Sequence, residues 1–393
     1  MRVRWSLVGA LVCGLVAGCG ILPGNTPPVT EEVWVVKTPI DRPPPVDPME
    51  VLFESLSVDQ KIGQLLMVAL DVGGDVDGLV DLVSKGRVTG VLLLGNGWSV
   101  TDVSDASAAL NKQAARQPVG LYIAVDQEGG VVQRLSGSGF SKIPAAKKQG
   151  TWSAAKLTTS ARTWAEELRS AGVNLNFAPV ADTVPSSMVS TNKPIGVLGR
   201  NFSTNPKVVS RQAAAFIEGM KAAGIQTCVK HFPGLGRVTG NTDFSSKGIT
   251  DGTTKRNDSY VRAFAEAMEA GPDMVMMSLA TYSKIDSKRP AVFSPKVIND
   301  LLRGELGWEG VVITDALNAA AVKSTAVGKR GVAFIKAGGD IAIIPGVSDL
   351  KKAAAGIKNE MEANEDFAAQ VDAAVWRVLK AKAAAGLLSS ELP

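Results

Sequence analysis

The 393-residue chain contains very little histidine, cysteine or aromatic side chain. His231 is the only histidine, there are three cysteines, and Phe, Trp and Tyr together make up 5% of the residues. No zinc-type ligand spacing and no phosphate-binding P-loop is present, so we expect neither a metal ion nor a cofactor. The net charge is only +4 and no basic stripe stands out, which gives nucleic-acid binding little support.

The N-terminus has the pattern of an export signal. "MRVRW" is basic, and the apolar segment "SLVGALVCGLVAG" is too short for a comfortable membrane span. The ending "LVAGC" resembles a bacterial lipobox, which implies cleavage after residue 18 and a lipid on the thiol of Cys19. We therefore expect a protein that is anchored to the outer, extracytoplasmic face of the cell membrane through Cys19. We also expect it to be a monomer. The alternative is an ordinary signal peptide that is cut nearby.

Little cysteine is left for cross-linking after this processing. Cys13 leaves with the signal peptide and Cys19 is acylated, so that Cys228 remains alone and no disulfide can form within the chain. Cys228 lies in an apolar run and is expected to be a buried small hydrophobic residue.

The remaining chain divides into a spacer and one domain. Residues 19–47 are rich in proline, which predicts an extended linker. In residues 48–393, apolar runs alternate with alanine-rich amphipathic segments, a pattern typical of parallel strands covered by helices on both faces. About eight such units predict an α/β fold of the (β/α)₈ TIM-barrel type. A doubly wound open sheet is the alternative, although no GxGxxG follows the first run. The runs are "GQLLMVAL", "VTGVLLLG", "VGLYIAVD", "NLNFAPVAD", "IQTCVKHF", "DMVMMSLA", "GVVITDAL" and "DIAIIPG".

Polar residues stand at the ends of several successive runs. In a barrel, the carboxyl ends of the strands meet at one site, so these side chains should converge. A single Asp after a strand is usually a helix cap or a turn former, but a series of such positions favours a functional site. The residues are Asp126, Asp182, Lys230, His231, Ser278 and Asp315.

These residue types allow several chemistries. Asp315 can serve as a nucleophile, a base or a hydrogen-bond acceptor, and its spacing equally suits the N-cap of a helix that begins near Ala316. Lys230 can form a Schiff base or donate hydrogen bonds to hydroxyls. The segment "VDQEGGVVQRL" offers acceptors and a forked donor for sugar hydroxyls, from Asp126, Glu128 and Arg134. The alternative is that these residues only form a local salt bridge beside a Gly-Gly turn.

Several longer motifs, in order along the whole domain, resemble one family. The sequence is similar to the N-acetylglucosaminidase-type branch of the family 3 glycoside hydrolases. The motifs are "VDQEGGVVQRL", "NLNFAPVAD", "GVLGRNF", "KHFPGLG", "PAVFSPKVINDLLRGELGWEGVVITDAL" and "AGGDIAIIP".

The resemblance implies a barrel and a retaining mechanism. Asp315 matches the aspartate that attacks the anomeric carbon to form a glycosyl-enzyme intermediate. Other matching positions hold the hydroxyls of the terminal sugar in the −1 subsite, the pocket for the sugar whose bond is cleaved. These positions are Asp126, Arg134, Arg200, Lys230 and His231.

One part of the family pattern is missing. In this branch a mobile loop after "KHFPGHG" ends in "DSH", where the histidine protonates the leaving oxygen. Here an ungapped count places Asn241 and Asp243 at the positions of that aspartate and histidine, and the histidine of "GHG" is Leu235. Asp243, or Asp251 after a register shift, can replace the acid if its pKa is raised towards neutrality.

We therefore expect a retaining exo-β-glycosidase that resembles β-N-acetylglucosaminidases and acts on cell-envelope glycan or its fragments. Asp243 is the candidate acid/base. The alternatives are a family 3 enzyme for another sugar or for activated leaving groups, a glycan-binding lipoprotein with little turnover, and, more remotely, a Lys230 aldolase-type lyase. The sequence leaves open whether water or phosphate is the acceptor.

Overall fold

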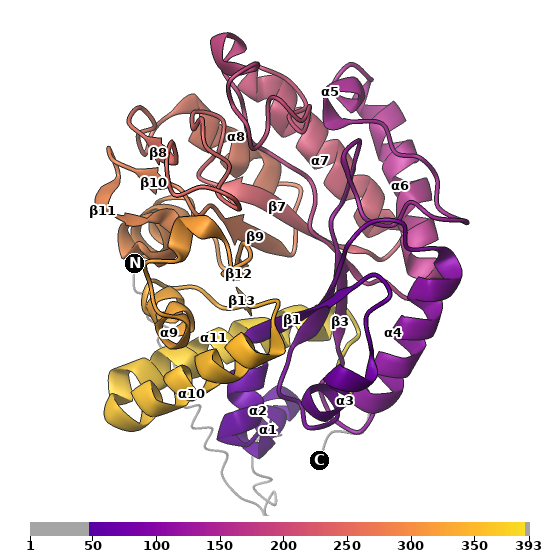
Figure 1. Ribbon diagram of the computed structural model, residues 1–393, viewed down its shortest axis with the longest axis vertical. Helices are drawn as coiled ribbons and strands as arrows, with labels where there is room; N and C mark the ends of the chain where they lie inside the picture. Colours follow the sequence, from indigo (N-terminus) through magenta and orange to yellow (C-terminus); the bar gives the residue numbers. More distant parts are fainter. Residues whose placement is uncertain (1–46, 390–393) are drawn as a thin grey trace, which may run out of the picture. The chain divides into compact units, whose positions relative to one another are not determined.

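The computed structural model describes residues 47–389, whose core is a ring of eight parallel strands (Figure 1). The strands neighbour one another in the order β12-β9-β7-β6-β3-β2-β1-β13. A parallel bridge between Ile313 and Ile341 joins the two ends of this series, which makes a nearly closed barrel. The strands are β1 Leu66–Asp71, β2 Gly90–Leu94, β3 Tyr122–Val125, β6 Leu175–Asn176, β7 Gln226–Phe232, β9 Met274–Met277, β12 Val311–Thr314 and β13 Ala342–Ile343.

Each of the eight apolar runs in the sequence coincides with one of these strands, with β1 extending one residue beyond its run, so the barrel prediction is confirmed and the open doubly wound sheet is wrong. The strands read as continuous apolar runs because they are buried on both faces, by the barrel interior and by the outer helices. The predicted signal peptide, Cys19 and the linker up to residue 46 lie outside the described residues.

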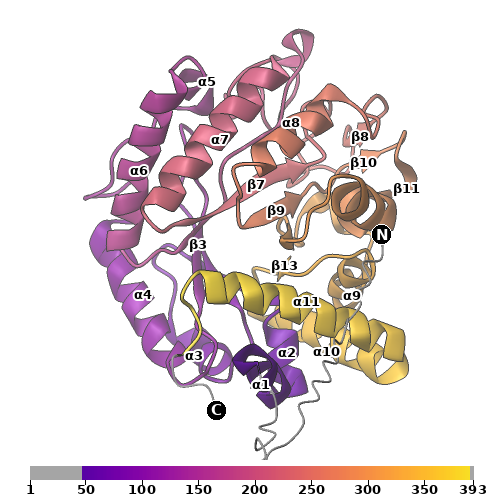
Figure 2. The ribbon, with the colours of Figure 1, turned by 180° about the vertical axis from the view of Figure 1, so that it is seen from behind.

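Helices follow one another around the outside of the barrel (Figures 1 and 2). Local sequence fixes where they begin. Ser99 and Asp102 form a capping box at α4, and Asn205 caps α7 just before Pro206. The outer helices are α3 Asp77–Ser84, α4 Val100–Ala114, α5 Ala146–Gln149, α6 Ala154–Ser170, α7 Pro206–Ala222, α8 Ser259–Met268, the π-helix η3 Lys296–Glu305, α9 Val327–Lys336 and α10 Val347–Ala363.

The amino ends of the strands are covered by α11 Glu365–Ala384, which passes in front of the strands in Figure 2. Lys382 of α11 is fully buried there, and its Nζ atom donates to Gln64 Oε1 (2.9 Å), Thr89 O (2.9 Å) and Gly120 O (2.6 Å). These three acceptors precede β1, β2 and β3, so one buried side-chain nitrogen ties three strands together.

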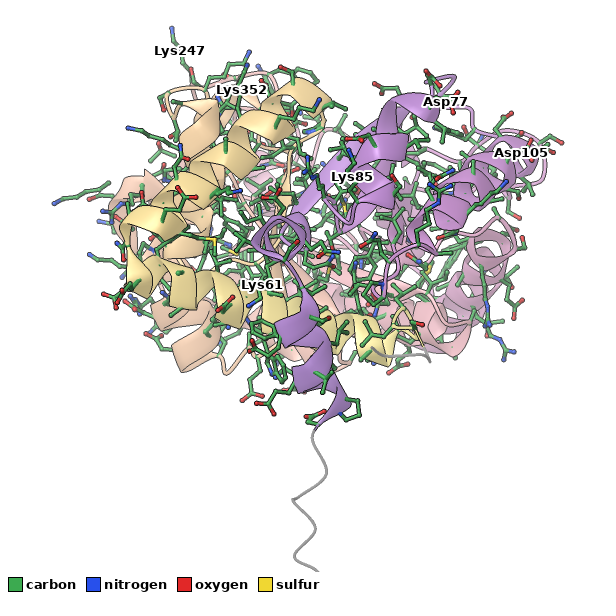
Figure 3. All side chains as sticks on the ribbon, turned by 90° about the horizontal axis from the view of Figure 1, so that it is seen from below. Lys61, Asp77, Lys85, Asp105, Lys247 and Lys352 are labelled. Atoms are coloured by element: carbon green, nitrogen blue, oxygen red, sulfur yellow. The ribbon has the colours of Figure 1, made fainter. Side chains whose placement is uncertain are left out.

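The short helices α1 Pro48–Ser55 and α2 Val58–Gly63 lie at the lower edge of the molecule in Figure 1. Lys61 of α2, labelled in Figure 3, packs over the ring of Phe53 in α1 and lies 3.1 Å from Asp372 Oδ1 of α11.

Long segments after the carboxyl ends of the strands carry the remaining structure. The hairpin of β4 Gln127–Gly129 and β5 Val132–Gln133 follows β3 directly. A small sheet combines β8 Thr250–Asp251, β10 Thr281–Tyr282 and β11 Asp286–Pro290. Short 3₁₀ turns occur at η1 Ser186–Met188, η2 Ala291–Phe293 and η4 Ala320–Val322. Within residues 47–389, no helix is both long enough and apolar enough to cross a membrane.

Candidate active site

A pocket of about 420 Å³ opens at the carboxyl ends of the strands, with a size typical of a small-ligand site. Its floor is apolar and includes Leu92 of β2, Met276 of β9 and Ile343 of β13. Every residue predicted to act on substrate lines this pocket, although the sequence separates them by up to 189 positions. They are Asp126, Arg134, Arg200, Lys230, His231, Asp243 and Asp315.

A buried lysine and a partly buried arginine share one buried carboxylate at the side of the pocket. Arg200 donates to both oxygens of Glu128, from Nη2 at 2.7 Å and from Nε at 2.8 Å. Lys230 Nζ lies 2.7 Å from Glu128 Oε1 and 2.5 Å from Asp126 Oδ1. Glu128 does not line the pocket, so its role is to hold the cations that do.

The charge states follow from this arrangement. Burial alone would raise the pKa of Glu128, but the charges of Arg200 and Lys230 outweigh it and hold the pKa well below its ordinary value. Burial alone would lower the pKa of Lys230, but Asp126 and Glu128 outweigh it and raise the pKa. Lys230 is therefore an ammonium group, which suits hydroxyl binding and argues against an aldolase-type Schiff base, because that chemistry needs a neutral amine.

A β-bulge in β7 brings Lys230 and His231 to the same side. Consecutive strand residues normally point to opposite faces, but Lys230 pairs with Met276 and Phe232 with Met277, which leaves His231 as the extra residue. His231 Nδ1 lies 2.7 Å from Asp182 Oδ2. Asp182 also accepts a hydrogen bond from Leu235 N (2.6 Å) and is fully buried, so it orients His231 and leaves Nε2 as the ring nitrogen for the pocket.

Arg134 reaches the pocket because the β4–β5 hairpin folds back towards the end of β3. Its backbone N–H donates to Asp126 O at 3.4 Å, and its Nη1 donates to Asn96 Oδ1 at 3.0 Å. The buried Nε has no hydrogen-bond partner among the described residues and is available as a donor.

Asp315 follows β12 directly and lies half-buried in the pocket wall. Its Oδ1 accepts a hydrogen bond from Ala316 N (2.7 Å). No helix begins at Ala316: turns lead into η4, and α9 begins only at Val327, so the helix N-cap interpretation is wrong. The second carboxylate oxygen of Asp315 makes no hydrogen bond within the described residues and can face a ligand.

The loop that should carry the acid covers one side of the pocket. Asn241, Thr242, Asp243 and Phe244 all line it. The loop is fixed to the segment after Asp315 by two backbone hydrogen bonds, from Ala320 N to Asp243 O and from Ala321 N to Thr242 O, each 3.0 Å. Farther along the loop, Lys247 projects away from the ribbon (Figure 3).

Asp243 has the altered titration that an acid/base requires. More than a third of its surface is solvent-accessible, but the surrounding loop and pocket wall partly desolvate the carboxyl group. This desolvation is the largest cause of a raised pKa, and the negative charge of Asp315 raises the pKa further. The pKa is thereby raised to about 6, although His231 and Arg200 oppose the rise.

Two other predicted strand-end or loop residues have structural roles. Asp251 is buried and accepts hydrogen bonds from Thr253 N (2.7 Å), Thr254 N (2.9 Å) and Thr254 Oγ1 (2.5 Å), away from the pocket lining. It is therefore not placed to act as the acid. Ser278 is fully buried and accepts a hydrogen bond from Tyr282 Oη at 2.9 Å. In residues 47–389, no group of three or more His, Cys, Asp or Glu side chains is placed to hold a metal ion.

Comparisons with known proteins agree on one family. The profile of the glycosyl hydrolase family 3 N-terminal domain matches residues 57–381. A β-hexosaminidase of Stenotrophomonas maltophilia is 35% identical over 273 residues, which cover 67% of this chain and 78% of that protein.

Solved structures show the same relationship. The crystal structure of a β-N-acetylhexosaminidase from Beutenbergia cavernae matches with a TM-score of 0.80 and 42% identity, covering 84% of this chain and 99% of that one. A family 3 β-N-acetylglucosaminidase from Paenibacillus sp. FPU-7 matches with a TM-score of 0.74 and 28% identity, covering 86% of this chain and 65% of that one. The chain belongs to glycosyl hydrolase family 3 and is a glycoside hydrolase similar to the family's β-N-acetylhexosaminidases.

Proposed function

We propose that this protein is a retaining exo-β-N-acetylglucosaminidase in which the carboxyl group of Asp243 replaces the usual loop histidine as acid/base. The observation that carries the proposal is the position of Asp243 on the pocket wall, with a pKa raised to about 6 by desolvation and by Asp315. A carboxyl group with this pKa is about half protonated at pH 6 and about one tenth protonated at pH 7, whereas an ordinary aspartate is almost fully ionised there.

The two carboxyl groups then have different roles. Asp315 attacks the anomeric carbon, and Asp243 donates its proton to the glycosidic oxygen as the bond to that oxygen breaks. The products of this step are a glycosyl ester on Asp315 and a free alcohol. Asp243, now a carboxylate, removes a proton from the incoming water as the water attacks the anomeric carbon. The bond between that carbon and the Asp315 oxygen breaks, which restores the Asp315 carboxylate and leaves Asp243 protonated.

The rest of the pocket orients the terminal sugar. Asp126 and His231 offer acceptors or donors to hydroxyl groups, and Lys230, Arg134 and Arg200 add donors. Holding these donors and acceptors fixed lowers the entropic cost of reaching the transition state. The names of similar proteins, β-hexosaminidase and β-N-acetylglucosaminidase, support a β-linked N-acetylglucosamine as this sugar.

The cellular setting rests on the N-terminal sequence. The lipobox-like "LVAGC" supports a lipid anchor on Cys19 at the extracytoplasmic face of the cell membrane, where N-acetylglucosamine occurs in the envelope glycan. The proline-rich segment 19–47 supports a spacer between that anchor and the barrel.

The proposal is tested with aryl β-N-acetylglucosaminides that carry either activated or poor leaving groups. Wild type should release sugar from both, Asp315→Ala from neither, and Asp243→Ala mainly from the activated substrate. If Asp243→Ala has no effect while Asp315→Ala abolishes release, Asp243 is not the acid. If wild type releases no sugar even from activated substrates but still binds a glycan, the protein is a binding relative.

A further inference from the structure

Phe244 is the most exposed large hydrophobic residue among the described residues, with 84% of its surface accessible. Single apolar side chains on a surface are ordinary and need no explanation. Phe244 differs in its place, because it lines the pocket and directly follows Asp243.

The backbone holds Phe244 at the pocket mouth. Its N–H donates to Asn241 O at 3.3 Å, within the turn that also presents Asp243. The hydrogen bonds from Ala320 N and Ala321 N fix this turn to the segment after Asp315, and Gly240 N donates to Gly248 O (2.7 Å) at the base of the loop. The backbone position of Phe244 is therefore coupled to the segments that carry both carboxyl groups.

The order of groups along a substrate decides what Phe244 can meet. In the proposed function, the terminal sugar lies against Asp126, Lys230 and the other pocket residues, and the glycosidic oxygen lies where Asp243 can protonate it. The leaving group extends from that oxygen towards the pocket mouth, where the residue after Asp243 is exposed. The flat phenyl ring of Phe244 is suited to stack against the C–H face of a second pyranose ring. That sugar ring would cover the phenyl surface that is now exposed to water.

We propose that Phe244 is the stacking platform for the second sugar ring, in the +1 subsite, and so selects saccharides over small alcohols as leaving groups. This inference rests on the proposed function, because it takes Asp243 as the group that faces the leaving oxygen. Asn318, which is exposed on the pocket wall in the segment after Asp315, offers an amide for the hydroxyls at the edge of that ring.

The test compares two substrates with the same terminal sugar and unactivated leaving groups, N,N′-diacetylchitobiose and methyl β-N-acetylglucosaminide. For each variant, the measured quantity is the ratio of kcat/KM for the disaccharide to kcat/KM for the methyl glycoside. Phe244→Ala should lower this ratio roughly 3- to 10-fold, in line with the usual strength of aromatic stacking. Phe244→Tyr should keep the ratio, and Phe244→Leu, which keeps apolar surface but loses the flat face, should give an intermediate value.

Equal losses for both substrates would show that the substitution disturbs the loop and would overturn the platform. A binding measurement separates this result from failure of the proposed function. In an Asp315→Asn background, isothermal titration should show that Phe244→Ala weakens binding of the disaccharide more than binding of N-acetylglucosamine. Equal weakening would overturn the platform, whereas absence of sugar release from activated aryl substrates by wild type would overturn the function alone.

Discussion

His231 Nδ1 lies 2.7 Å from Asp182 Oδ2, which fixes the only imidazole of the chain at the end of β7, whereas the acid loop carries no histidine. The pairing of His231 with Asp182 therefore joins a strand-end residue to a buried carboxylate, and the loop must take its proton donor from another residue. A histidine fixed in this way suits a constant contact with the bound sugar.

The first prediction follows from that contact. His231→Gln should lower kcat/KM roughly 10- to 100-fold, the range for loss of a hydrogen bond in a buried site. The loss should be similar for activated and poor leaving groups, because His231 binds the sugar and does not protonate the oxygen. Steady-state kinetics on a pair of aryl glycosides measures this, and a loss confined to poor leaving groups would instead identify His231 as the acid.

The pH dependence should report Asp243. Its pKa is raised to about 6, so the fraction in the proton-donating form falls as the pH rises through that value. For substrates with poor leaving groups, kcat/KM should therefore decline above about pH 6, and this limb should vanish in Asp243→Ala. A limb that persists unchanged in the variant would assign the titration to another group.

Glu128 should stabilise the folded protein through its ion pairs with Arg200 and Lys230, although it does not line the pocket. Glu128→Gln leaves Arg200 and Lys230 buried without their shared negative charge, which should lower the free energy of unfolding by about 3–5 kcal/mol. Urea unfolding measures the loss. The matched control is Glu166→Gln, which breaks an exposed pair with Arg162 and should change stability by no more than about 0.5 kcal/mol. Equal effects of the two substitutions would contradict the assigned role.

Lys382 should stabilise the opposite end of the barrel. Lys382→Met removes a donor from three buried acceptors, and we expect a loss of about 2–4 kcal/mol in the free energy of unfolding. The activity per folded molecule should not change, since Lys382 lies at the amino ends of the strands. Lys380→Met, an exposed position on the same helix, is the control, and a similar loss in both variants would show that Lys382 has no special role.

The sequence was sufficient to predict the barrel because its strands are buried on both faces and therefore appear as continuous apolar runs. Residue type and resemblance together also identified the acidic and basic residues that line the pocket, but not its neutral residues such as Phe244 and Asn318. The interactions that orient them were not visible, because they join distant positions. Glu128 meets Arg200 72 residues later, and Asp182 meets His231 49 residues later. The bulge that turns Lys230 and His231 to the same side is likewise a property of pairing with β9 and has no signal in the local sequence.

Spacing alone could not decide between candidate carboxylates in the loop. Asp243 and Asp251 are both plausible acids by sequence, and only the fold shows that Asp251 is enclosed by Thr253 and Thr254. The Asp315 cap interpretation failed for a similar reason, because the chain after Asp315 forms turns that receive the loop through Ala320 and Ala321 instead of a helix.

The most direct test of the central claim is azide rescue of Asp243→Ala on an activated aryl β-N-acetylglucosaminide. Loss of the acid/base carboxylate slows attack of water on the glycosyl-enzyme and opens space for a small anion, which needs no base. We predict that azide accelerates the variant but not wild type, and that the product is the β-glycosyl azide. No acceleration in an Asp243→Ala variant that still releases the aryl group, or an α-glycosyl azide as the product, would contradict the assignment of Asp243 and the retaining mechanism.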